Sequence, residues 1–170
     1  MKPLGSTDLK RLHREWRRRT PGRLALVLHD VQSPFNVGAI VRTAAAYRVD
    51  HVWCVGRTPD LADPKVGKTA LGCERYLTWE VVEDGVEPAR AAGYQVVGLE
   101  LAEGASPLHE CALGADVALV VGHEDHGLPR PVLEACDQVA FLPLLGRVGS
   151  LNVATAAAIA CYEVRRRAWV

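Results

Sequence analysis

The sequence predicts an α/β domain in which helices cover both faces of a mostly parallel sheet. From Leu24 onward, short apolar runs alternate with helix-like stretches, an order that is typical of βαβ units. The apolar runs are continuous, as expected of strands that are buried on both faces. Glycine and proline punctuate the loops, and neither an internal repeat nor a second domain is visible. A chain of 170 residues suits one such domain.

Residues 1–22 form a basic helical extension ahead of the domain, which covers residues 23–170. Ser6 or Thr7 can cap a helix that runs to about Arg19, where a Pro-Gly pair stops it. Apolar residues recur at helical spacing, so one stripe can dock on the domain while the arginines face solvent. The stripe consists of Leu9, Leu12 and Trp16.

Charge is segregated along the chain, although the net charge is zero. Residues 1–23 contain eight basic and two acidic residues, a net charge of +6, so the remainder carries −6. This asymmetry favours an arm that binds a polyanion, attached to a near-neutral body. A solvated helix without a ligand is the alternative interpretation.

Five strands and four helices are predicted within the domain. Each strand is a short apolar run bounded by polar or turn-forming residues. The strands are 24–28, 51–55, 95–99, 117–121 and 139–142. The helices are 37–47, 86–92, 130–136 and 151–167. The last helix is rich in alanine, which lets another element or subunit approach closely, and its arginine-rich end suits the negative end of a helix dipole.

Cysteine usage and the lengths of the apolar runs restrict the class of protein. The five cysteines are widely spaced and form no C-x-x-C pair, which argues against a disulfide framework and a cysteine zinc site. We expect reduced, mostly buried thiols. The longest apolar run, residues 153–162, is far shorter than a membrane span of ~20 residues. The N-terminus also lacks the apolar core of a signal peptide, so we predict a cytoplasmic protein without a membrane partner.

The first candidate site segment, residues 29–44, follows the first predicted strand. Pro34 disfavours helix at Ser33, and Asn36 is a good N-cap for the helix that follows. Arg42 lies nearly two turns beyond Asn36, so both side chains can face one side of that helix. Open α/β sheets place their sites at such strand ends. A plain cap and a surface charge are the alternative interpretation.

The second segment, residues 122–128, places several ionisable side chains at the end of a buried strand, which is costly unless they are solvated or used. His123, Glu124 and His126 are of the types that bind zinc. Their spacing is not H-E-x-x-H, and no further His or Cys cluster follows. We therefore predict no metal, and a metal-dependent hydrolase stays as a competing hypothesis.

The third segment, residues 141–156, runs through a glycine-rich loop into the last helix, for which Ser150 is the expected cap. Two nucleotide-binding motifs are not supported elsewhere. Residues 62–69 mimic a Walker A loop, but Pro64 lacks the backbone N–H group that cradles phosphate. No G-x-G-x-x-G follows the first strand, so a nicotinamide-dependent oxidoreductase is not expected.

Together, the three segments resemble the motifs of the SpoU (TrmH-type) RNA 2'-O-ribose methyltransferases of the SPOUT superfamily. The N-x-G-x-x-x-R-T-A motif is matched by Asn36, Gly38, Arg42, Thr43 and Ala44. The G-x-E-x-x-G-L motif is matched by Gly122, Glu124, Gly127 and Leu128. The P-x-x-G-x-x-x-S-L-N-V motif is matched by Pro143, Gly146, Ser150, Leu151, Asn152 and Val153. The resemblance covers about residues 24–167, with order and spacing in agreement.

This resemblance implies a C-terminal trefoil knot, an obligate homodimer with active sites at the subunit interface, and S-adenosyl-L-methionine as cofactor. Carried over by position, the cofactor-binding residues are Leu99, Leu101, Gly122, Leu142, Leu144, Leu151 and Asn152. The catalytic residues are Arg42, Asn36, Glu124, Ser150 and Asn152. Together with the basic extension, the expected RNA-binding residues are Arg11, Arg14, Arg17, Arg18 and Arg42.

The implied reaction transfers a methyl group to a ribose 2'-hydroxyl of RNA. The family proposal makes the arginine a general base, but a guanidinium stays protonated in proteins. We expect Arg42, with a substrate phosphate, to orient the hydroxyl and stabilise its developing negative charge. Two departures from the family pattern are Ala39, where a second asparagine is frequent, and the unusually ionisable second motif.

The basic helix directly before the first strand resembles the branch of the family that modifies a D-loop guanosine of tRNA. We therefore expect tRNA as substrate, with ribosomal RNA as the alternative. A non-catalytic RNA-binding relative is a further alternative. The intact site residues argue against it, because a binder needs no donor pocket.

Overall fold

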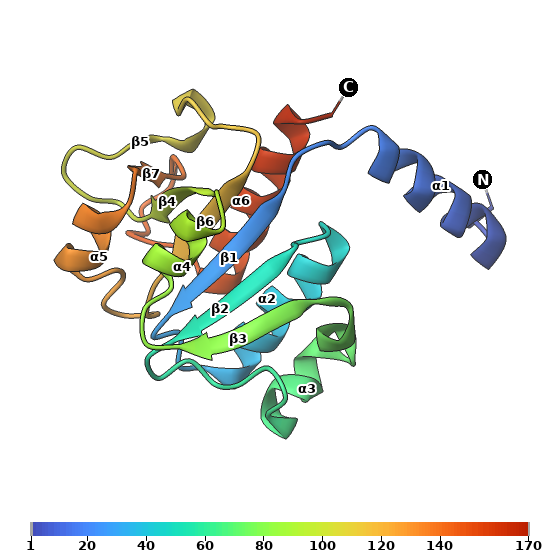
Figure 1. Cartoon of the computed structure of the whole chain (residues 1–170), viewed down its shortest axis with the longest axis horizontal. Coiled ribbons are helices and arrows are strands. Elements are labelled where there is room, and N and C mark those ends of the chain that lie inside the picture. The colour runs from blue at the N-terminus through green and yellow to red at the C-terminus, as the bar shows by residue number, and fades with distance from the viewer. Residues whose placement is uncertain (1, 170) are drawn as a thin grey trace.

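The computed structural model describes residues 2–169 and contains one seven-stranded sheet in which every pairing is parallel (Figure 1). The strands are β1 (Leu24–His29), β2 (His51–Val55), β3 (Thr78–Val82), β4 (Gln95–Leu99), β5 (Ser106–Pro107), β6 (Val117–Val121) and β7 (Gln138–Phe141). Their order across the sheet is β3-β2-β1-β6-β4-β7-β5. The predicted α/β class is confirmed, and among the strands the prediction missed the two edge strands β3 and β5.

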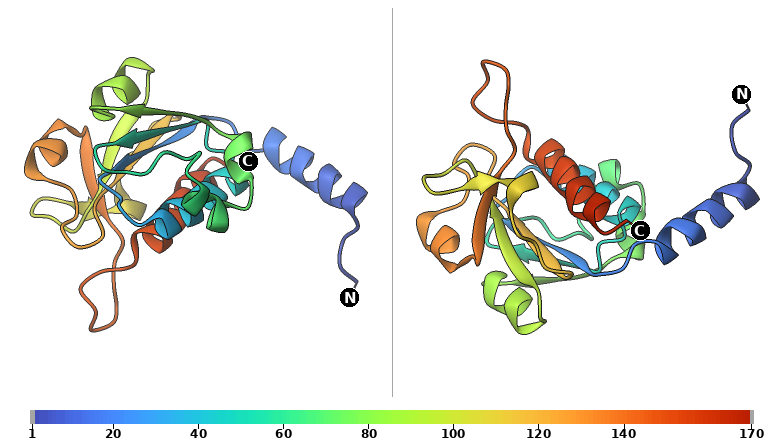
Figure 2. Two further views of the ribbon diagram at one scale, coloured as in Figure 1. Left: turned by 90° about the horizontal axis from the view of Figure 1, so that it is seen from below. Right: turned by 90° about the horizontal axis from the view of Figure 1, so that it is seen from above.

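Helices cover both faces of the sheet, as predicted (Figure 2). The helices are α1 (Ser6–Arg18), α2 (Pro34–Ala46), α3 (Pro64–Ala70), α4 (Val86–Ala91), α5 (Arg130–Ala135) and α6 (Val153–Arg167), with 3-10 turns η1 (Cys73–Tyr76) and η2 (Leu108–Glu110). Residues of α2, α3 and α6 build the core on one face, and residues of α4 and α5 pack on the other.

Strand β1 shows why its apolar run is continuous. Leu24, Leu26 and Leu28 belong to the core under α2 and α6, whereas Ala25 and Val27 belong to the core under α4. Successive side chains of a strand point to opposite faces, so a strand covered on both sides needs apolar residues at every position. All five of these side chains are fully buried.

The C-terminal helix α6 packs closely on α2 because alanines face the core. Ala157 and Ala160 are fully buried there, which confirms that the alanine-rich face admits another element. From the sequence, the arginines are expected to interact with the C-terminal end of this helix. Arg165 instead contacts other segments of the chain. Its guanidinium is buried and donates to the backbone oxygens of Tyr47 (2.9 Å) and Gly22 (2.9 Å). Burial lowers the pKa of this guanidinium.

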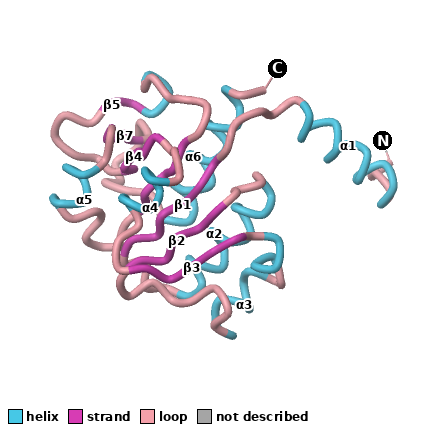
Figure 3. Tube along the Cα trace, in the orientation of Figure 1, coloured by secondary structure: helices cyan, strands magenta, loops and turns pink. Residues whose placement is uncertain are grey.

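The basic helix α1 extends away from the body and is joined to β1 by a short loop (Figures 1 and 3). Its N-cap is Gly5, without a side-chain hydrogen bond, so neither Ser6 nor Thr7 is the cap. None of its residues is buried, and the predicted docking of the apolar stripe is confined to its last turn. There the Trp16 ring lies 5.1 Å from that of Trp169. Leu9 and Leu12 stay exposed.

The Walker-like segment is helical, which explains why it is not a phosphate-binding loop. Asp63 caps α3 by accepting from the backbone N of Lys65 (2.7 Å), and Pro64 occupies the first turn. Proline is favoured at this position because its missing N–H is not needed there. No helix is predicted here from the sequence, because the glycines and prolines of this region are interpreted as loop residues. Two of those glycines are Gly67 and Gly72. These glycines lie inside the helix and after its end.

The five cysteines are free, with Cys54, Cys111 and Cys161 buried and Cys73 and Cys136 partly buried. The expected burial of most thiols is therefore confirmed. Over residues 2–169, no helix combines the length and apolar character that crossing a membrane requires.

Candidate functional site

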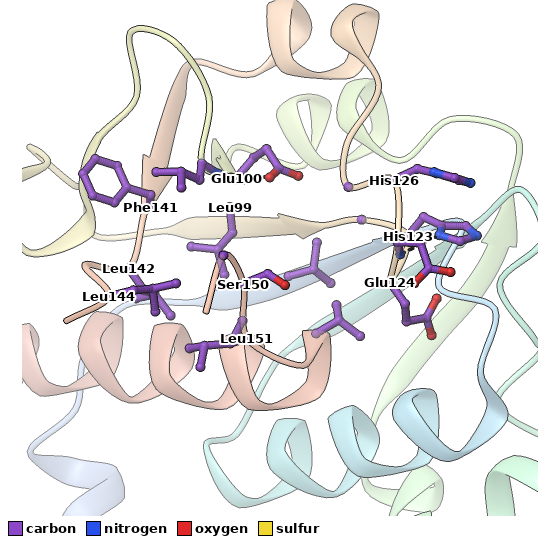
Figure 4. A pocket seen from close by; sticks show the side chains of 18 residues that line it. Leu99, Glu100, His123, Glu124, His126, Phe141, Leu142, Leu144, Ser150 and Leu151 are labelled. Atoms are coloured by element: carbon purple, nitrogen blue, oxygen red, sulfur yellow. Dashed lines mark hydrogen bonds between the residues drawn. The ribbon is translucent and has the colours of Figure 1, made fainter. Parts of the chain in front are cut away.

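The carboxyl ends of four neighbouring strands, β1, β6, β4 and β7, meet at one edge of the sheet and bring the three motif segments together. A pocket of about 280 Å³ opens there (Figure 4), just below the usual range for small-molecule sites. Six of the seven predicted cofactor-binding residues line it, namely Leu99, Leu101, Gly122, Leu142, Leu144 and Leu151. Asn152 is not part of the lining and is placed just beyond it by the chain.

The pocket has an apolar end and a polar end (Figure 4). Leucine side chains from β4, from the loop after β7 and from the residue before the α6 cap gather at the apolar end. His123, Glu124 and His126 lie at the polar end, and Ser150 lies between the two. Such a pocket suits a ligand that has a flat apolar group at one end and charged groups at the other.

The Glu124 carboxylate connects the second segment to the first. It accepts hydrogen bonds from the backbone N–H groups of Gln32 (3.1 Å) and Ser33 (2.9 Å) and from Nδ2 of Asn36 (2.9 Å). Burial alone raises the pKa of this carboxyl, but the hydrogen bonds from Asn36, Ser33 and Gln32 outweigh burial and hold the pKa below its ordinary value. The carboxylate is therefore an ionised acceptor that ties two loops together.

Asn36 extends this connection to the third segment. Its Oδ1 accepts a hydrogen bond from Nδ2 of Asn152 (3.0 Å), while Oδ1 of Asn152 accepts from the backbone N–H groups of Ala154 (2.9 Å) and Thr155 (3.2 Å). Glu124, Asn36 and Asn152 thus form a continuous chain of hydrogen bonds across all three motifs. The three segments therefore converge in the structure.

Two further expected helix caps, besides that of α1, are wrong, and the reason matters for the site. Ser33, not Asn36, caps α2, since Pro34 at the first helical position starts the helix earlier. Asn152, not Ser150, caps α6. As a result the Asn36 amide is free to bridge Glu124 and Asn152, and Ser150 stays in the exposed pocket loop.

A tight hairpin carries the second motif, and its glycines are required by close approach. A Cβ at Gly122 would lie 2.5 Å from the carbonyl carbon of Gly127, and one at Gly127 would lie 2.0 Å from Oε2 of Glu100. That same Glu100 oxygen accepts from the backbone N of Leu128 (2.9 Å). Glu100 therefore anchors the hairpin from the end of β4. Sequence reasoning missed it, although a carboxylate directly after a buried strand was a usable signal.

Arg42 stands apart from this chain of hydrogen bonds. Its side chain is exposed on α2, does not line the pocket, and has no hydrogen bond or ion pair with any of residues 2–169. Six residues of helix leave Arg42 rotated by about 120° from Asn36, so helical spacing alone does not put both on one side. The guanidinium is thus available to a ligand that approaches from solvent.

The other arginines proposed for RNA lie on α1. Arg11, Arg14 and Arg18 surround a shallow depression on this helix, and Nε of Arg17 donates to the backbone oxygen of His13 (3.3 Å). All four are exposed. The helix therefore presents a row of cations that the domain does not cover.

Between residues 2 and 169, no group of three or more His, Cys, Asp and Glu side chains is placed to hold a metal ion. Nδ1 of His123 accepts from the backbone N of Asp125 (3.0 Å) and is engaged within the hairpin. The metal-dependent hydrolase hypothesis finds no support in this arrangement.

Comparison with known sequences places the chain in one family. Residues 23–162 match the family model described as the SpoU rRNA Methylase family. The chain is 35% identical over 145 residues to the 23S rRNA (guanosine(2553)-2'-O)-methyltransferase of Bacillus subtilis, covering 84% of this chain and 58% of the relative. It is 30% identical over 153 residues to the tRNA (guanosine(18)-2'-O)-methyltransferase of Escherichia coli, covering 88% and 66%. The chain thus spans about three-fifths of the length of these curated relatives.

Solved structures agree in fold. An rRNA methyltransferase from Sinorhizobium meliloti, determined with AdoMet bound, superposes with a TM-score of 0.76 at 30% identity, covering 88% of this chain and 58% of that one. A structure described as giving insights into 2-OH methylation of C/U34 on tRNA matches with a TM-score of 0.75 at 29% identity, covering 86% and 97%. With the family model matched over most of the domain and the three motifs joined at one pocket, the chain belongs to the SpoU rRNA methylase family.

Proposed function

We propose that the protein is an S-adenosyl-L-methionine-dependent 2'-O-ribose methyltransferase of RNA that works in the cytoplasm. The observation that best supports this proposal is the chain of hydrogen bonds from Glu124 through Asn36 to Asn152. It lies beside a pocket whose shape suits the methyl donor. Relatives named as 2'-O-methyltransferases of 23S rRNA and of tRNA support the reaction class. We favour tRNA as substrate, with a D-loop guanosine as the candidate target, because α1 is basic; ribosomal RNA is the alternative.

The pocket fits the proposed methyl donor. The adenine ring would lie among the leucines of the apolar end, and the charged amino acid part would face Ser150, between that end and the histidines. The residues proposed to hold it are Leu99, Leu101, Gly122, Leu142, Leu144 and Leu151, which line the pocket, together with Asn152 just beyond the lining. Once bound, S-adenosyl-L-methionine supplies an electrophilic methyl group on a sulfonium centre.

In the proposed mechanism, Arg42 and the Glu124 connection have separate roles. The 2'-oxygen of the ribose would form a bond to the methyl carbon as the bond from that carbon to the donor sulfur breaks, which leaves S-adenosyl-L-homocysteine. The hydroxyl proton would pass to solvent water, and negative charge develops on the oxygen as it does so. Arg42 orients the hydroxyl and stabilises this charge. Glu124 already accepts three hydrogen bonds and has a lowered pKa, which makes it a poor proton acceptor. Glu124 acts by fixing Asn36 and, through Asn36, the Asn152 cap at the start of α6. Ser150 lines the pocket next to this connection.

The proposal includes a homodimer and the C-terminal trefoil knot. The loop between β7 and α6 projects from the body (Figure 2), with Leu145 fully exposed and Val148 65% exposed. Ile159 is also exposed on α6, and a second copy would cover these apolar groups. Strand β7 lies between β4 and β5, although both precede it in the chain, an order that fits a threaded C-terminal segment. Sedimentation analysis at micromolar concentration measures the dimer.

The decisive test of the function is methylation itself. Incubation with labelled donor and separated tRNA and ribosomal RNA pools, followed by mass spectrometry of the product, identifies the RNA and the modified ribose. Calorimetric titration with S-adenosyl-L-methionine tests the pocket independently. A pure dimer that binds no donor would favour a non-catalytic RNA-binding relative, and metal found in the purified protein would revive the hydrolase.

The role of α1 as an RNA arm gives a separate prediction. Replacing Arg11, Arg14, Arg17 and Arg18 by alanine preserves helix propensity and removes four charges. We expect weaker RNA binding, and the slope of log K against log salt should become shallower by about three, because each phosphate contact contributes roughly 0.7–0.9 to that slope. Deletion of residues 1–19 should act in the same direction. Donor affinity, measured in parallel, should not change. An unaltered salt slope would contradict the role of α1 in RNA binding.

A further inference from the structure

Two imidazole rings lie stacked at the polar end of the pocket (Figure 4). The ring centroids of His123 and His126 are 4.7 Å apart, and the ring planes differ by 28°. His126 is exposed and has no hydrogen bond or ion pair with residues 2–169. The chain of hydrogen bonds through Glu124 does not use it, so its aromatic surface has no partner other than His123.

The lower ring of this stack is held from both sides. Nδ1 of His123 accepts from the backbone N of Asp125 (3.0 Å). With its amide oriented to satisfy both neighbours, Gln32 accepts from Nε2 of His123 (3.1 Å) and from the guanidinium of Arg57 (2.8 Å). These two contacts fix the His123 ring and place a cation next to it. The side chain of Arg57 is 71% exposed.

The hairpin that carries both rings is itself preorganised. The backbones of His123 and Gly127 exchange two hydrogen bonds of 3.2 and 2.9 Å. Glu100 holds the following residue, Leu128, through its backbone N (2.9 Å). An aromatic surface on a rigid support loses little conformational entropy when a ligand stacks on it.

We propose that His126, supported by His123, is a stacking platform for a nucleobase of the RNA substrate at the mouth of the pocket. The inference rests on the proposed function and names a contact by which that function would recognise RNA. Single-stranded bases stack on aromatic side chains, histidine included, and each such contact contributes to affinity without requiring a given base. The Arg57 guanidinium, which shares Gln32 with His123 and pairs with Asp30 (3.6 Å), is the cation proposed to contact the phosphate of the stacked nucleotide. The apolar end and the part of the pocket beside Ser150 are left for the methyl donor.

His126→Ala removes the platform with little risk to the fold, since the side chain makes no hydrogen bond. His126→Phe restores an aromatic face without imidazole nitrogens. His109→Ala is the matched control, because this histidine is also exposed but lies on η2, outside the pocket lining. Binding of fluorescein-labelled bulk tRNA and of ribosomal RNA fragments is measured by anisotropy, donor binding by calorimetry, and the melting temperature by calorimetric scanning.

The alanine variant should bind RNA about tenfold more weakly, as expected for loss of one stacked base, and the phenylalanine variant should recover most of that loss. Donor affinity and melting temperature should equal those of the wild type and of His109→Ala. Equal RNA affinity in His126→Ala and wild type would overturn the proposal. So would an effect confined to the donor, or failure of phenylalanine to rescue, which would assign His126 a hydrogen-bonding or charge role.

A direct readout is the Cε1 proton of His126, assigned by its absence from the alanine variant in proton NMR. A stacked base should shift this resonance upfield on addition of RNA, and an unmoved resonance in RNA-saturated protein would overturn the platform. The two proposals fail separately. If the wild type binds RNA through His126 but methylates none, only the methyltransferase proposal is refuted. If RNA binding and methylation are the same in the wild type and in His126→Ala, only the stacking platform is refuted. Absence of RNA binding refutes both.

Discussion

Arg42→Ala is expected to lower kcat by about 10²–10³-fold, the effect of removing one preorganised group that stabilises developing negative charge. Donor affinity should stay near that of the wild type, because Arg42 does not line the pocket. The fold should also be intact, since this exposed side chain has no hydrogen bond or ion pair within the described part of the chain. Single-turnover methylation with saturating donor, together with calorimetric donor binding, separates these effects. Arg75→Ala, a change at another exposed arginine, is the control.

Arg42→Lys distinguishes what the guanidinium contributes. Lysine keeps the positive charge but not the planar, bidentate set of donors that can engage a phosphate and a hydroxyl together. We expect the lysine variant to stay within about tenfold of the alanine variant. Near-full activity with lysine would show that charge alone suffices and would discredit the orienting role of Arg42.

The central strands were predictable almost to the residue because their burial on both faces leaves a direct mark on the sequence. Strand β6, with five buried residues in succession, is an example. The edge strand β3 was not predictable in this way, since Thr78, Glu80 and Val81 are exposed and the run carries a charge. Strand β5 has only two residues, and its pairing with β7 comes from the tertiary arrangement rather than from local preference.

The candidate site also has one part that the sequence could predict and one part that it could not. Motif spacing identified the three segments. Six of the cofactor-binding positions inferred from the family resemblance, five leucines and one glycine, line the pocket. The contacts between segments were beyond reach of the sequence, because Glu124 and Asn36 are separated by 88 residues and Asn36 and Asn152 by 116. Capping rules were applied to each helix alone. They assigned Asn36 to its own helix end, whereas in the fold its amide serves Glu124 and Asn152.

Glu124→Gln should be the most damaging conservative change in the chain of hydrogen bonds. The new amide nitrogen would face N–H donors from Gln32, Ser33 or Asn36 in place of an acceptor. Loss of hydrogen bonds to a charged group costs about 1.5–3 kcal/mol, so the free energy of unfolding should fall by that order. Methylation should drop by about 10–100-fold, since a small displacement of catalytic groups has a large effect on rate.

The pH dependence of this change identifies the charge as its cause. The folded state lowers the pKa of Glu124, so its ionised form stabilises the fold at pH values above the unfolded-state pKa, about 4.3. That contribution is lost as pH falls through the folded-state pKa, because both states then bind the proton. Urea unfolding of wild type and Glu124→Gln should therefore give a large difference at pH 7 and a shrinking one below about pH 4. Glu134→Gln, at an exposed carboxylate, should show neither effect. A difference that stays constant with pH would mean that the substitution acts by shape, and the ionised Glu124 would lose its place as the link between the three motifs.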